Sequence, residues 1–197
     1  MMLINEVAPF SPVEAVVMTV PYERYTSKRK QYGWRQKSTV YFRTETSEGI
    51  PLLDALHGNV HNLLDRHEAI LTGCGDKVSY HIHMHGYIPL RCQKYSYYQK
   101  HGEKFANTRA KVARQIAEAV QDFIDKRQYE EHAEDWRVGP GYIELKHLYL
   151  LELRHVASGC FQPILGVLRP THRVPGPYIP SICLCPITAK FTCVKYR

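Results

Sequence analysis

Cysteine is scarce in this sequence: 197 residues contain six, and no pair has the CxxC spacing. A disulfide framework needs a denser set of cysteines, and many zinc motifs use that spacing. We therefore expect reduced thiols. Cys183 and Cys185 share one face of a predicted strand, so they are either candidate metal ligands or partly buried thiols.

Long apolar runs are also missing. The longest run near the start, residues 13–20, contains Glu14 and is too short to cross a bilayer, and no signal-peptide pattern precedes it. We expect a cytoplasmic protein with no membrane partner. Because 44% of the residues are apolar, the chain can bury a core, and its length favours one domain.

The motifs of several enzyme classes are absent. The sequence has no glycine-rich phosphate loop, no Ser-His-Asp order and no dinucleotide-binding fingerprint. Kinases, hydrolases and dehydrogenases therefore lack support. The chain also shows no internal repeat and no low-complexity tract.

Acidic residues are rare in two stretches of the chain. Residues 22–43 and 91–114 each contain seven Lys and Arg residues against one Glu, a combined charge of +12, whereas the rest of the chain sums to −5. The positive charge is thus segregated, and its distribution says more about partners than the modest total of +7.

The hydrophobic pattern predicts both helices and strands. Helical spacing of apolar residues indicates one helix from Pro51 to about Ile70 and a second that begins after Asn107 or Thr108. The period leaves residues 142–155 open between strand and helix, and a hairpin with residues 160–168 is favoured. The other predicted strands are residues 14–20, 38–44, 77–88 and 182–194.

These elements predict an α+β fold in which helices cover one face of an antiparallel sheet, and the ferredoxin-like arrangement is the favoured example. Residues 1–140 are expected to form the core with a basic hairpin. Residues 141–197 are expected to form a β-rich, proline-rich extension of the same domain. The other sheet face would meet solvent, a ligand or another chain.

Three histidines alternate with other residues in the segment SYHIHMHGY, residues 79–87. In a strand, one set of side chains would face the helices, namely Val78, Tyr80, Ile82 and Met84. The other set would lie on the open face, namely Ser79, His81, His83, His85 and Tyr87.

This spacing allows a metal site without requiring one. Alternate strand residues are about 6.6 Å apart, so one ion cannot readily bind all three histidines. His81 with His83, or His83 with His85, would chelate a divalent ion if a further ligand joined. The alternative is a row of polar residues that face solvent, and we expect no required cofactor.

A His-apolar-His pair followed by tyrosines resembles the metal-binding motif of HUH nucleases. Those enzymes nick or join single-stranded DNA through a covalent phosphotyrosine. The resemblance implies that His81 and His83 hold a metal while a tyrosine attacks the phosphate. The candidate nucleophiles are Tyr97, Tyr98 and Tyr129.

The segments PLLDALHGNVHNLL, residues 51–64, and DKVSY, residues 76–80, resemble another family. They are similar to the first helix and the following strand of the CRISPR repeat-processing endoribonucleases of type I-F systems. Those enzymes cleave RNA without a metal, and the resemblance implies that His61 is the catalytic histidine. By helical angle alone, His57 and His61 are ordinary surface histidines at the edge of the apolar stripe or outside it.

Aromatic residues interleave with cations in the first basic stretch. Flat rings stack on exposed bases while cations neutralise phosphates, so this combination is typical of a surface for RNA or single-stranded DNA. A charged loop without a ligand would look similar. The candidate nucleic-acid-binding residues here are Arg24, Lys28, Arg29, Lys30, Tyr32, Trp34, Arg35 and Lys37.

The second basic stretch places cations in the first turns of a predicted helix, where the helix dipole favours acidic side chains. A bound phosphate would offset that cost, because helix N-termini and basic side chains both attract it. The candidate binding residues of this stretch are Lys100, Lys104, Arg109, Lys111 and Arg114.

These features together predict a nucleic-acid-binding protein, with RNA or another single strand favoured. Three versions stay open. The first is a metal-independent endoribonuclease whose general base is His61, His81, His83 or His85. The second is a metal-dependent enzyme that nicks single-stranded DNA, and the third is a non-catalytic protein that coats nucleic acid. The sequence does not identify a protein partner.

Overall fold

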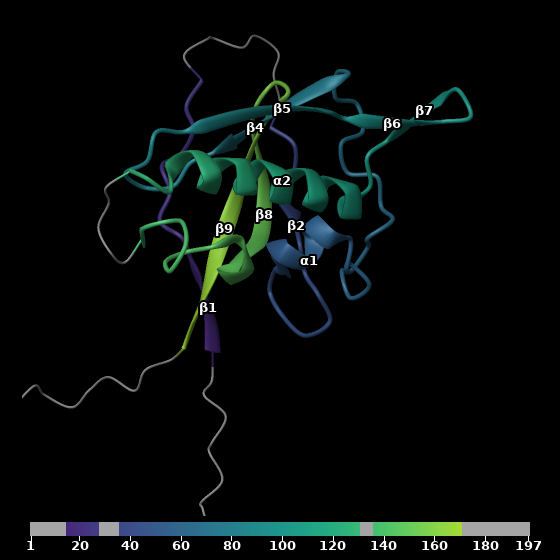
Figure 1. Ribbon diagram of the computed structural model, residues 1–197. Coiled ribbons are helices and arrows are strands. Elements are labelled where there is room, and N and C mark those ends of the chain that lie inside the picture. Colours follow the sequence, from purple (N-terminus) through teal and green to yellow (C-terminus); the bar gives the residue numbers. More distant parts are fainter. Residues whose placement is uncertain (1–14, 28–35, 131–135, 171–197) are drawn as a thin grey trace, which may run out of the picture.

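The computed structural model describes residues 15–27, 36–130 and 136–170 (Figure 1). The strands are β1 (Ala15–Thr19), β2 (Val40–Tyr41), β3 (Ile50–Pro51), β4 (Lys77–Ile82), β5 (Leu90–Tyr95), β6 (Tyr97–Lys100), β7 (Glu103–Ala106), β8 (Leu148–Ala157) and β9 (Cys160–Pro170). The helices are α1 (Leu52–His57), α2 (Arg109–Arg127) and a single 3-10 turn, η2 (Leu145–His147).

One sheet organises the molecule. Its strands run in the order β2-β8-β9-β4-β5, with β1 paired to the end of β9 and β3 paired to β8. All these pairs are antiparallel except β4 with β9. Both helices lie on one side of the sheet, so the predicted α+β class is confirmed (Figure 1). The ferredoxin-like arrangement is not confirmed, because α1 is a single short helix of six residues.

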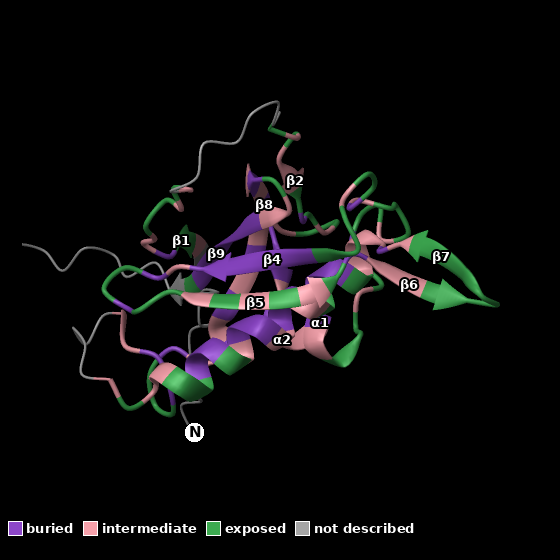
Figure 2. Ribbon diagram, turned by 90° about the horizontal axis from the view of Figure 1, so that it is seen from above, coloured by how far each residue is buried: buried purple, intermediate pink, exposed green. Residues whose placement is uncertain are grey.

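The core lies between α2 and the central strands (Figure 2). Apolar side chains of α2 recur at helical spacing and are buried, and Thr108 caps the helix by accepting a hydrogen bond from the Lys111 N–H. Val78, Tyr80 and Ile82 of β4 are buried in the same core. Burying each such side chain contributes about 2 kcal/mol to the stability of the fold. The apolar stripe of α2 therefore holds the helix against the sheet. The predicted start of the second helix is confirmed.

The strands β8 and β9 form the predicted hairpin and lie in the middle of the sheet. The segment 142–155 is therefore strand from Leu148 onward, preceded by η2. Strands were also predicted at residues 14–20 and 38–44, and β1 and β2 occupy these positions. The β-branched and aromatic residues of 14–20 and 38–44 located β1 and β2, whereas β8 was favoured only as one half of a hairpin with β9.

Two predicted elements end earlier in the structure than the sequence suggested. The helix expected up to Ile70 stops at His57, because Gly58 adopts a left-handed conformation with φ of 82° and its N–H returns to the Ala55 carbonyl. The strand expected up to residue 88 stops at Ile82.

The predicted strand at residues 182–194, with Cys183 and Cys185, lies outside the described residues. No helix in the described part is long and apolar enough to cross a membrane. Cys74, Cys92 and Cys160 are free thiols.

Candidate nucleic-acid interface

The β6–β7 hairpin projects from the body of the molecule beyond the sheet (Figure 1). Its two strands pair only with each other, in a separate two-stranded sheet. The hairpin, the start of β4, the end of β5 and the start of α2 carry a set of cations and aromatic rings that we call the hairpin surface: Lys77, Tyr95, Tyr97, Tyr98, Lys100, Lys104, Phe105 and Lys111.

Three lysines of the hairpin surface lie over tyrosine rings. The Lys104 ammonium is 4.3 Å from the centroid of the Tyr97 ring. The Lys111 ammonium is 4.3 Å from the Tyr98 ring, and the Lys77 ammonium is 5.2 Å from the Tyr95 ring. All three distances are within the range in which a cation is attracted to a ring face. Each pair therefore presents a positive charge beside a flat aromatic group.

The rings of the hairpin surface also pack on one another. Tyr95 and Tyr97 meet edge to face at 5.7 Å, and Tyr98 and Phe105 stack at 5.6 Å. These contacts fix ring positions while leaving much surface in water, since Tyr95 is 54% and Phe105 39% exposed. Large rings left in contact with water are a costly feature that a stacking partner would offset.

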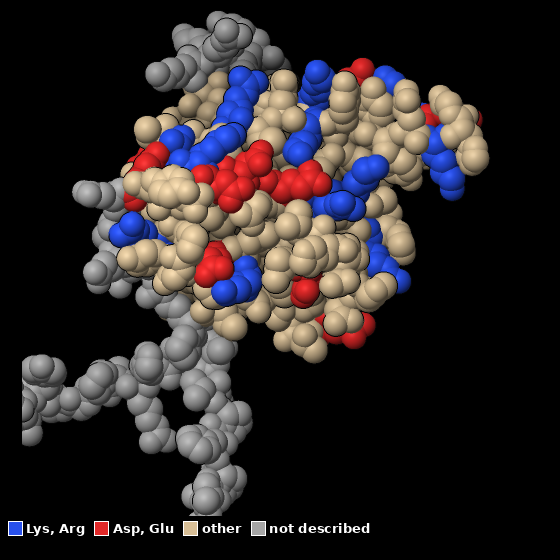
Figure 3. Space-filling model, viewed as in Figure 1, with Lys and Arg blue, Asp and Glu red and all other residues tan. Residues whose placement is uncertain are grey.

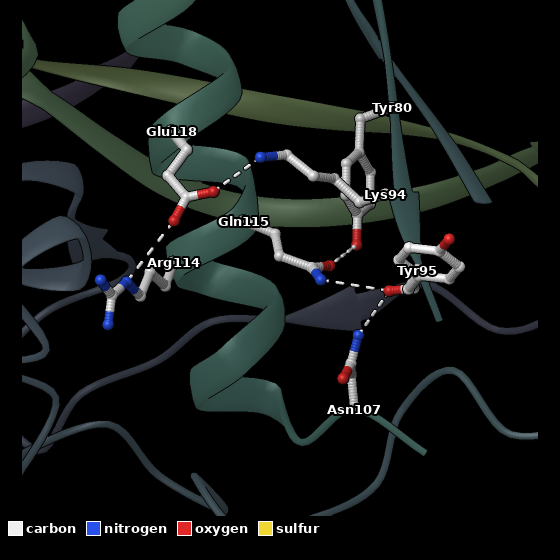
Figure 4. A network of polar contacts seen from close by, with 7 residues as sticks. All are labelled: Tyr80, Lys94, Tyr95, Asn107, Arg114, Gln115 and Glu118. Atoms are coloured by element: carbon white, nitrogen blue, oxygen red, sulfur yellow. Dashed lines mark hydrogen bonds and ion pairs between the residues drawn. The ribbon is translucent and has the colours of Figure 1, made fainter. Parts of the chain in front are cut away.

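A partly buried polar network holds the base of the hairpin against α2 (Figure 4). The Tyr95 carbonyl accepts from the Asn107 amide at 2.7 Å and from the Gln115 amide at 3.1 Å. The Tyr80 hydroxyl donates to Gln115 at 2.9 Å, which links β4 to the helix. These bonds join the root of the hairpin to the rigid core, so the position of the hairpin surface is defined.

The cations differ in how far acidic neighbours neutralise them. Lys94 and Arg114 both contact Glu118, at 2.6 and 3.5 Å. Lys104 pairs with Asp76 at 3.1 Å, and this hydrogen bond raises the pKa of Lys104. Both partners of that pair are exposed, so the pair contributes little stability and a phosphate competes with it readily.

Other cations of the hairpin surface have no such partner. Lys77, Lys100 and Lys111 form no ion pair with the residues that the structure describes. Figure 3 shows Lys and Arg side chains on the hairpin and at its base, with acidic side chains gathered nearer the middle of that face.

The Arg109 guanidinium is bound by other groups of the protein itself. It donates to Glu68 and to the Tyr41 carbonyl, and lies 4.0 Å from Asp65. Only 12% of the side chain is exposed. The predicted cation at the helix start is therefore stabilised by acidic neighbours of the chain itself, and it ties α2 to the loops beside it.

The first basic stretch is described only in part. Lys28, Arg29, Lys30, Tyr32, Trp34 and Arg35 lie outside the described residues. The Lys37 ammonium contacts the Thr72 carbonyl and the Cys74 sulfur. Lys37 and Arg43 line one hollow of about 710 Å³ together with Arg109. The described part of the first basic stretch therefore meets Arg109 of the second there.

Residues 21–27, which we call the strap, cross the sheet face opposite the helices. Gln162 of β9 fixes the strap twice: its oxygen accepts from the Tyr25 N–H at 3.0 Å, and its amide donates to the Glu23 carbonyl at 2.6 Å. The Pro21 carbonyl accepts from the His85 N–H at 2.9 Å. The face expected to be open is therefore partly covered by the chain's own N-terminal residues.

The strap changes the environment of the histidines. His81 lies on the face that alternation predicted, but it is only 7% exposed because the Tyr25 ring covers it at 4.1 Å. Burial, followed by the charges of His83 and Arg91, lowers the pKa of His81 to about 4. The prediction that His81 faces solvent is wrong, because the covering residues come from a segment distant in sequence.

The three histidines do not form one row. The His83 ring is 6.1 Å from the His81 ring, whereas His85 is exposed beyond the end of β4. Burial lowers the pKa of His83, against the raising effect of Glu23. The described residues contain no group of three or more His, Cys, Asp or Glu side chains arranged to hold a metal.

Tyr87 was expected beside the histidines, and this is wrong. Its ring packs edge to face on Phe123 of α2 at 5.6 Å, and its hydroxyl accepts from the Val138 N–H at 3.0 Å. The strand period fails here because β4 has ended and Gly86 turns the chain with φ of 83°.

The other predicted catalytic residues lie apart from one another. His61 is exposed in the turn after α1, so the helical position implied by the endoribonuclease resemblance is wrong. Tyr97 contacts Tyr95 and Lys104. Within the described part of the chain, no contact joins Tyr97 or His61 to His81 or His83.

Two residues that build these surfaces were not identified from the sequence. Lys77 stands directly opposite Tyr95 in the β4–β5 pair, and a correct register would have brought it to that tyrosine. Gln162 gave no local signal, because its partners in the strap are 137 and 139 residues away.

Comparison of the chain with protein family models, with curated proteins and with solved structures finds no match in any of the three.

Proposed function

We propose that this protein binds single-stranded nucleic acid, RNA or DNA, through the hairpin surface. The observation that carries the proposal is the set of three Lys–Tyr pairs on one projecting hairpin and its base, at 4.3, 4.3 and 5.2 Å. Cations meet phosphates while the free ring faces stack on bases, and each stacked base contributes about 1–3 kcal/mol.

Single strands fit this surface better than a duplex. Stacking needs unpaired bases, which a duplex keeps inside its helix. The exposed rings of Tyr95 and Phe105 stand on a narrow two-stranded hairpin and the strand end beside it. A flexible single strand of nucleic acid can follow this narrow hairpin, with its phosphate backbone near Lys77, Lys100 and Lys111.

The test is a binding titration by fluorescence anisotropy. Labelled 16-nucleotide single strands of RNA and DNA are compared with a duplex of the same sequence at fixed salt. We expect both single strands to bind more tightly than the duplex. Replacing Tyr95→Leu together with Tyr97→Leu should weaken single-strand binding at least tenfold, a loss of about 1.4 kcal/mol or more.

Tyr142 provides a matched control. Its ring is 41% exposed and lies 4.4 Å from the Arg137 guanidinium, so it has the same chemistry away from the hairpin. The Tyr142→Leu variant should bind as wild type. Equal binding by the wild type and by the double tyrosine variant would reject the proposal.

A second candidate is cleavage of the bound strand, and one observation favours it. Nε2 of His81 and Nδ1 of His83 are buried and have no hydrogen-bond partner among the described residues. Burial lowers the pKa of both rings, so the imidazoles are neutral near pH 7 and can accept a proton or bind a divalent ion.

Product analysis separates the versions of this second candidate. Cutting of single-stranded DNA that requires Mn²⁺ and is lost with EDTA supports a metal site at His81 and His83. Cutting of RNA in EDTA supports a metal-independent endoribonuclease. In both cases His83→Ala should abolish cutting while binding persists, and an intact substrate under every condition supports binding alone.

A cytoplasmic location belongs to the same proposal. Single-stranded nucleic acid is abundant there, and the reducing environment keeps thiols free. Cys74, Cys92 and Cys160 are all unpaired, which agrees with that environment. Localisation of a tagged full chain tests this part.

A further inference from the structure

A hollow of about 720 Å³ lies on the sheet face that the strap crosses. Its floor comes from the middle strands, and its walls come from residues 24–27 on one side and from 36–41 on the other. The hollow is separate from the hairpin surface, because the two share no residue. Its lining includes Arg24, Tyr25, Tyr41, Glu152, Arg154 and Gln162.

The hollow is a built site rather than a gap under a loop. Gln162 is 1% exposed and holds the strap wall through hydrogen bonds of 3.0 and 2.6 Å. The opposite wall is held where the Lys37 N–H donates to His155 Nδ1 at 2.9 Å, and where β2 pairs with β8. Both walls are therefore attached to the sheet, and the volume lies within the range of about 300–1,000 Å³ usual for small-ligand sites.

The lining of the hollow carries two arginines against one glutamate, a net charge of +1. Arg154 is held in place by Glu152 at 2.8 Å and by the Tyr22 hydroxyl at 2.6 Å, and these contacts raise its pKa further. Arg24 is exposed and forms no ion pair with any residue in the described ranges. A planar guanidinium fork that is already oriented binds phosphate with little loss of entropy.

The hollow is also lined by an aromatic ring and by side chains that can form hydrogen bonds with a ligand. Tyr41 is 47% exposed, and the Arg43 guanidinium lies 5.2 Å from its ring. Tyr41 lines the hollow and, being partly exposed, offers ring surface for stacking. The polar side chains of Thr26, Gln36 and Thr39 line the same space.

We propose that this hollow binds one nucleotide unit, a planar base with its phosphate. The phosphate meets Arg24 and Arg154, and the base lies against Tyr41. The same unit occurs as a free mononucleotide and as one residue of a single strand. The two sources share the chemistry that the hollow recognises, and the test separates them. The proposal does not depend on binding at the hairpin surface.

The experiment is isothermal titration calorimetry of the full chain with AMP, CMP and a 16-nucleotide single-stranded RNA. The variants Arg24→Gln and Tyr41→Leu are compared with Arg137→Gln and Tyr142→Leu, which remove an exposed cation–ring pair of the same kind elsewhere. Thermal unfolding checks that each variant is folded. Loss of one charged hydrogen bond or one stack should weaken binding about five- to tenfold.

Each outcome decides the question. Mononucleotide binding that only the hollow variants weaken shows a site for free nucleotides. Unchanged or absent mononucleotide binding, with RNA binding weakened by the hollow variants, shows a site for one residue of a strand. If hollow and control variants behave alike with every ligand, the proposal is wrong. Loss of RNA binding only in the Tyr95→Leu/Tyr97→Leu variant would reject the hollow and retain the hairpin surface.

Discussion

The ring of Tyr25 covers the ring of His81 at 4.1 Å, with the two planes tilted by 39°. This contact joins the strap to the central strand β4. It explains why a histidine on the sheet face opposite the helices is buried. The strap in turn forms one wall of the hollow that contains Arg154.

The burial of His81 predicts a loss of stability in mild acid. Burial lowers the pKa of His81 to about 4 from an unfolded value of 6.5, so the folded state favours the neutral ring. The stabilisation is present above pH 6.5 and is lost as the pH falls toward 4. We expect the free energy of unfolding to fall by about 2–3 kcal/mol across this window.

Urea unfolding of the wild type and of His81→Phe at several pH values measures this effect. The phenylalanine ring keeps the contact with Tyr25 and cannot be protonated, so the variant should lose most of the extra pH dependence. Parallel curves for the two proteins would show that His81 is not the group responsible.

Replacing Gln162 should destabilise the strap without disturbing the rest of the fold. In Gln162→Leu, the Tyr25 N–H and the Glu23 carbonyl both lose a partner. We expect a loss of about 1–3 kcal/mol in unfolding free energy. Hydrogen exchange should show faster exchange at Tyr25, and unchanged exchange there would contradict the anchoring role. The exposed Gln93→Leu change serves as control.

Gly166 lies where β9 passes between two other strands. A Cβ at this position would stand 2.5 Å from Val17 Cγ1 and 3.1 Å from Leu151 Cδ1. Gly166→Ala should therefore cost about 1–3 kcal/mol of stability through overpacking. Gly75→Ala meets open space and should be close to neutral in the same chemical denaturation experiment. Equal stability of the two variants would argue against the β1–β9 pairing.

Arg109 distinguishes a structural cation from a binding cation. Arg109→Leu removes the contacts with Glu68 and Tyr41 and leaves a carboxylate without its partner, so it should lower the unfolding free energy by about 1–3 kcal/mol. Because the guanidinium is occupied inside the protein, RNA affinity of the folded variant should change less than twofold. A tenfold loss of affinity without loss of stability would reverse this assignment.

The sequence predicted those elements whose signals are local. The apolar stripe of α2 is repeated over many residues and was located correctly. The strand β8 was favoured through its hairpin with β9, although its own period did not separate strand from helix. One glycine, Gly58, ended α1 early, and an apolar pattern that continued past it concealed the end. The environment of His81 was beyond local patterns, because the ring that covers it lies 56 positions earlier in the chain.

The candidate site was predicted only where its signals are local in the sequence. Lys100, Lys104 and Lys111 were identified as candidate binding residues, and the structure places Lys104 and Lys111 over Tyr97 and Tyr98. Composition did not reveal that Arg109 is neutralised by Glu68, a residue in a loop 41 positions away.

The salt dependence of RNA binding tests the central claim most directly. Each phosphate neutralised by a cation contributes about −0.7 to the slope of log K against log salt for a single strand. In the triple variant Lys77→Gln, Lys104→Gln and Lys111→Gln, the slope should become shallower by about 2, whereas Lys126→Gln with Lys146→Gln should leave it unchanged. An identical slope in the wild type and the triple variant would show that the hairpin surface does not bind the strand.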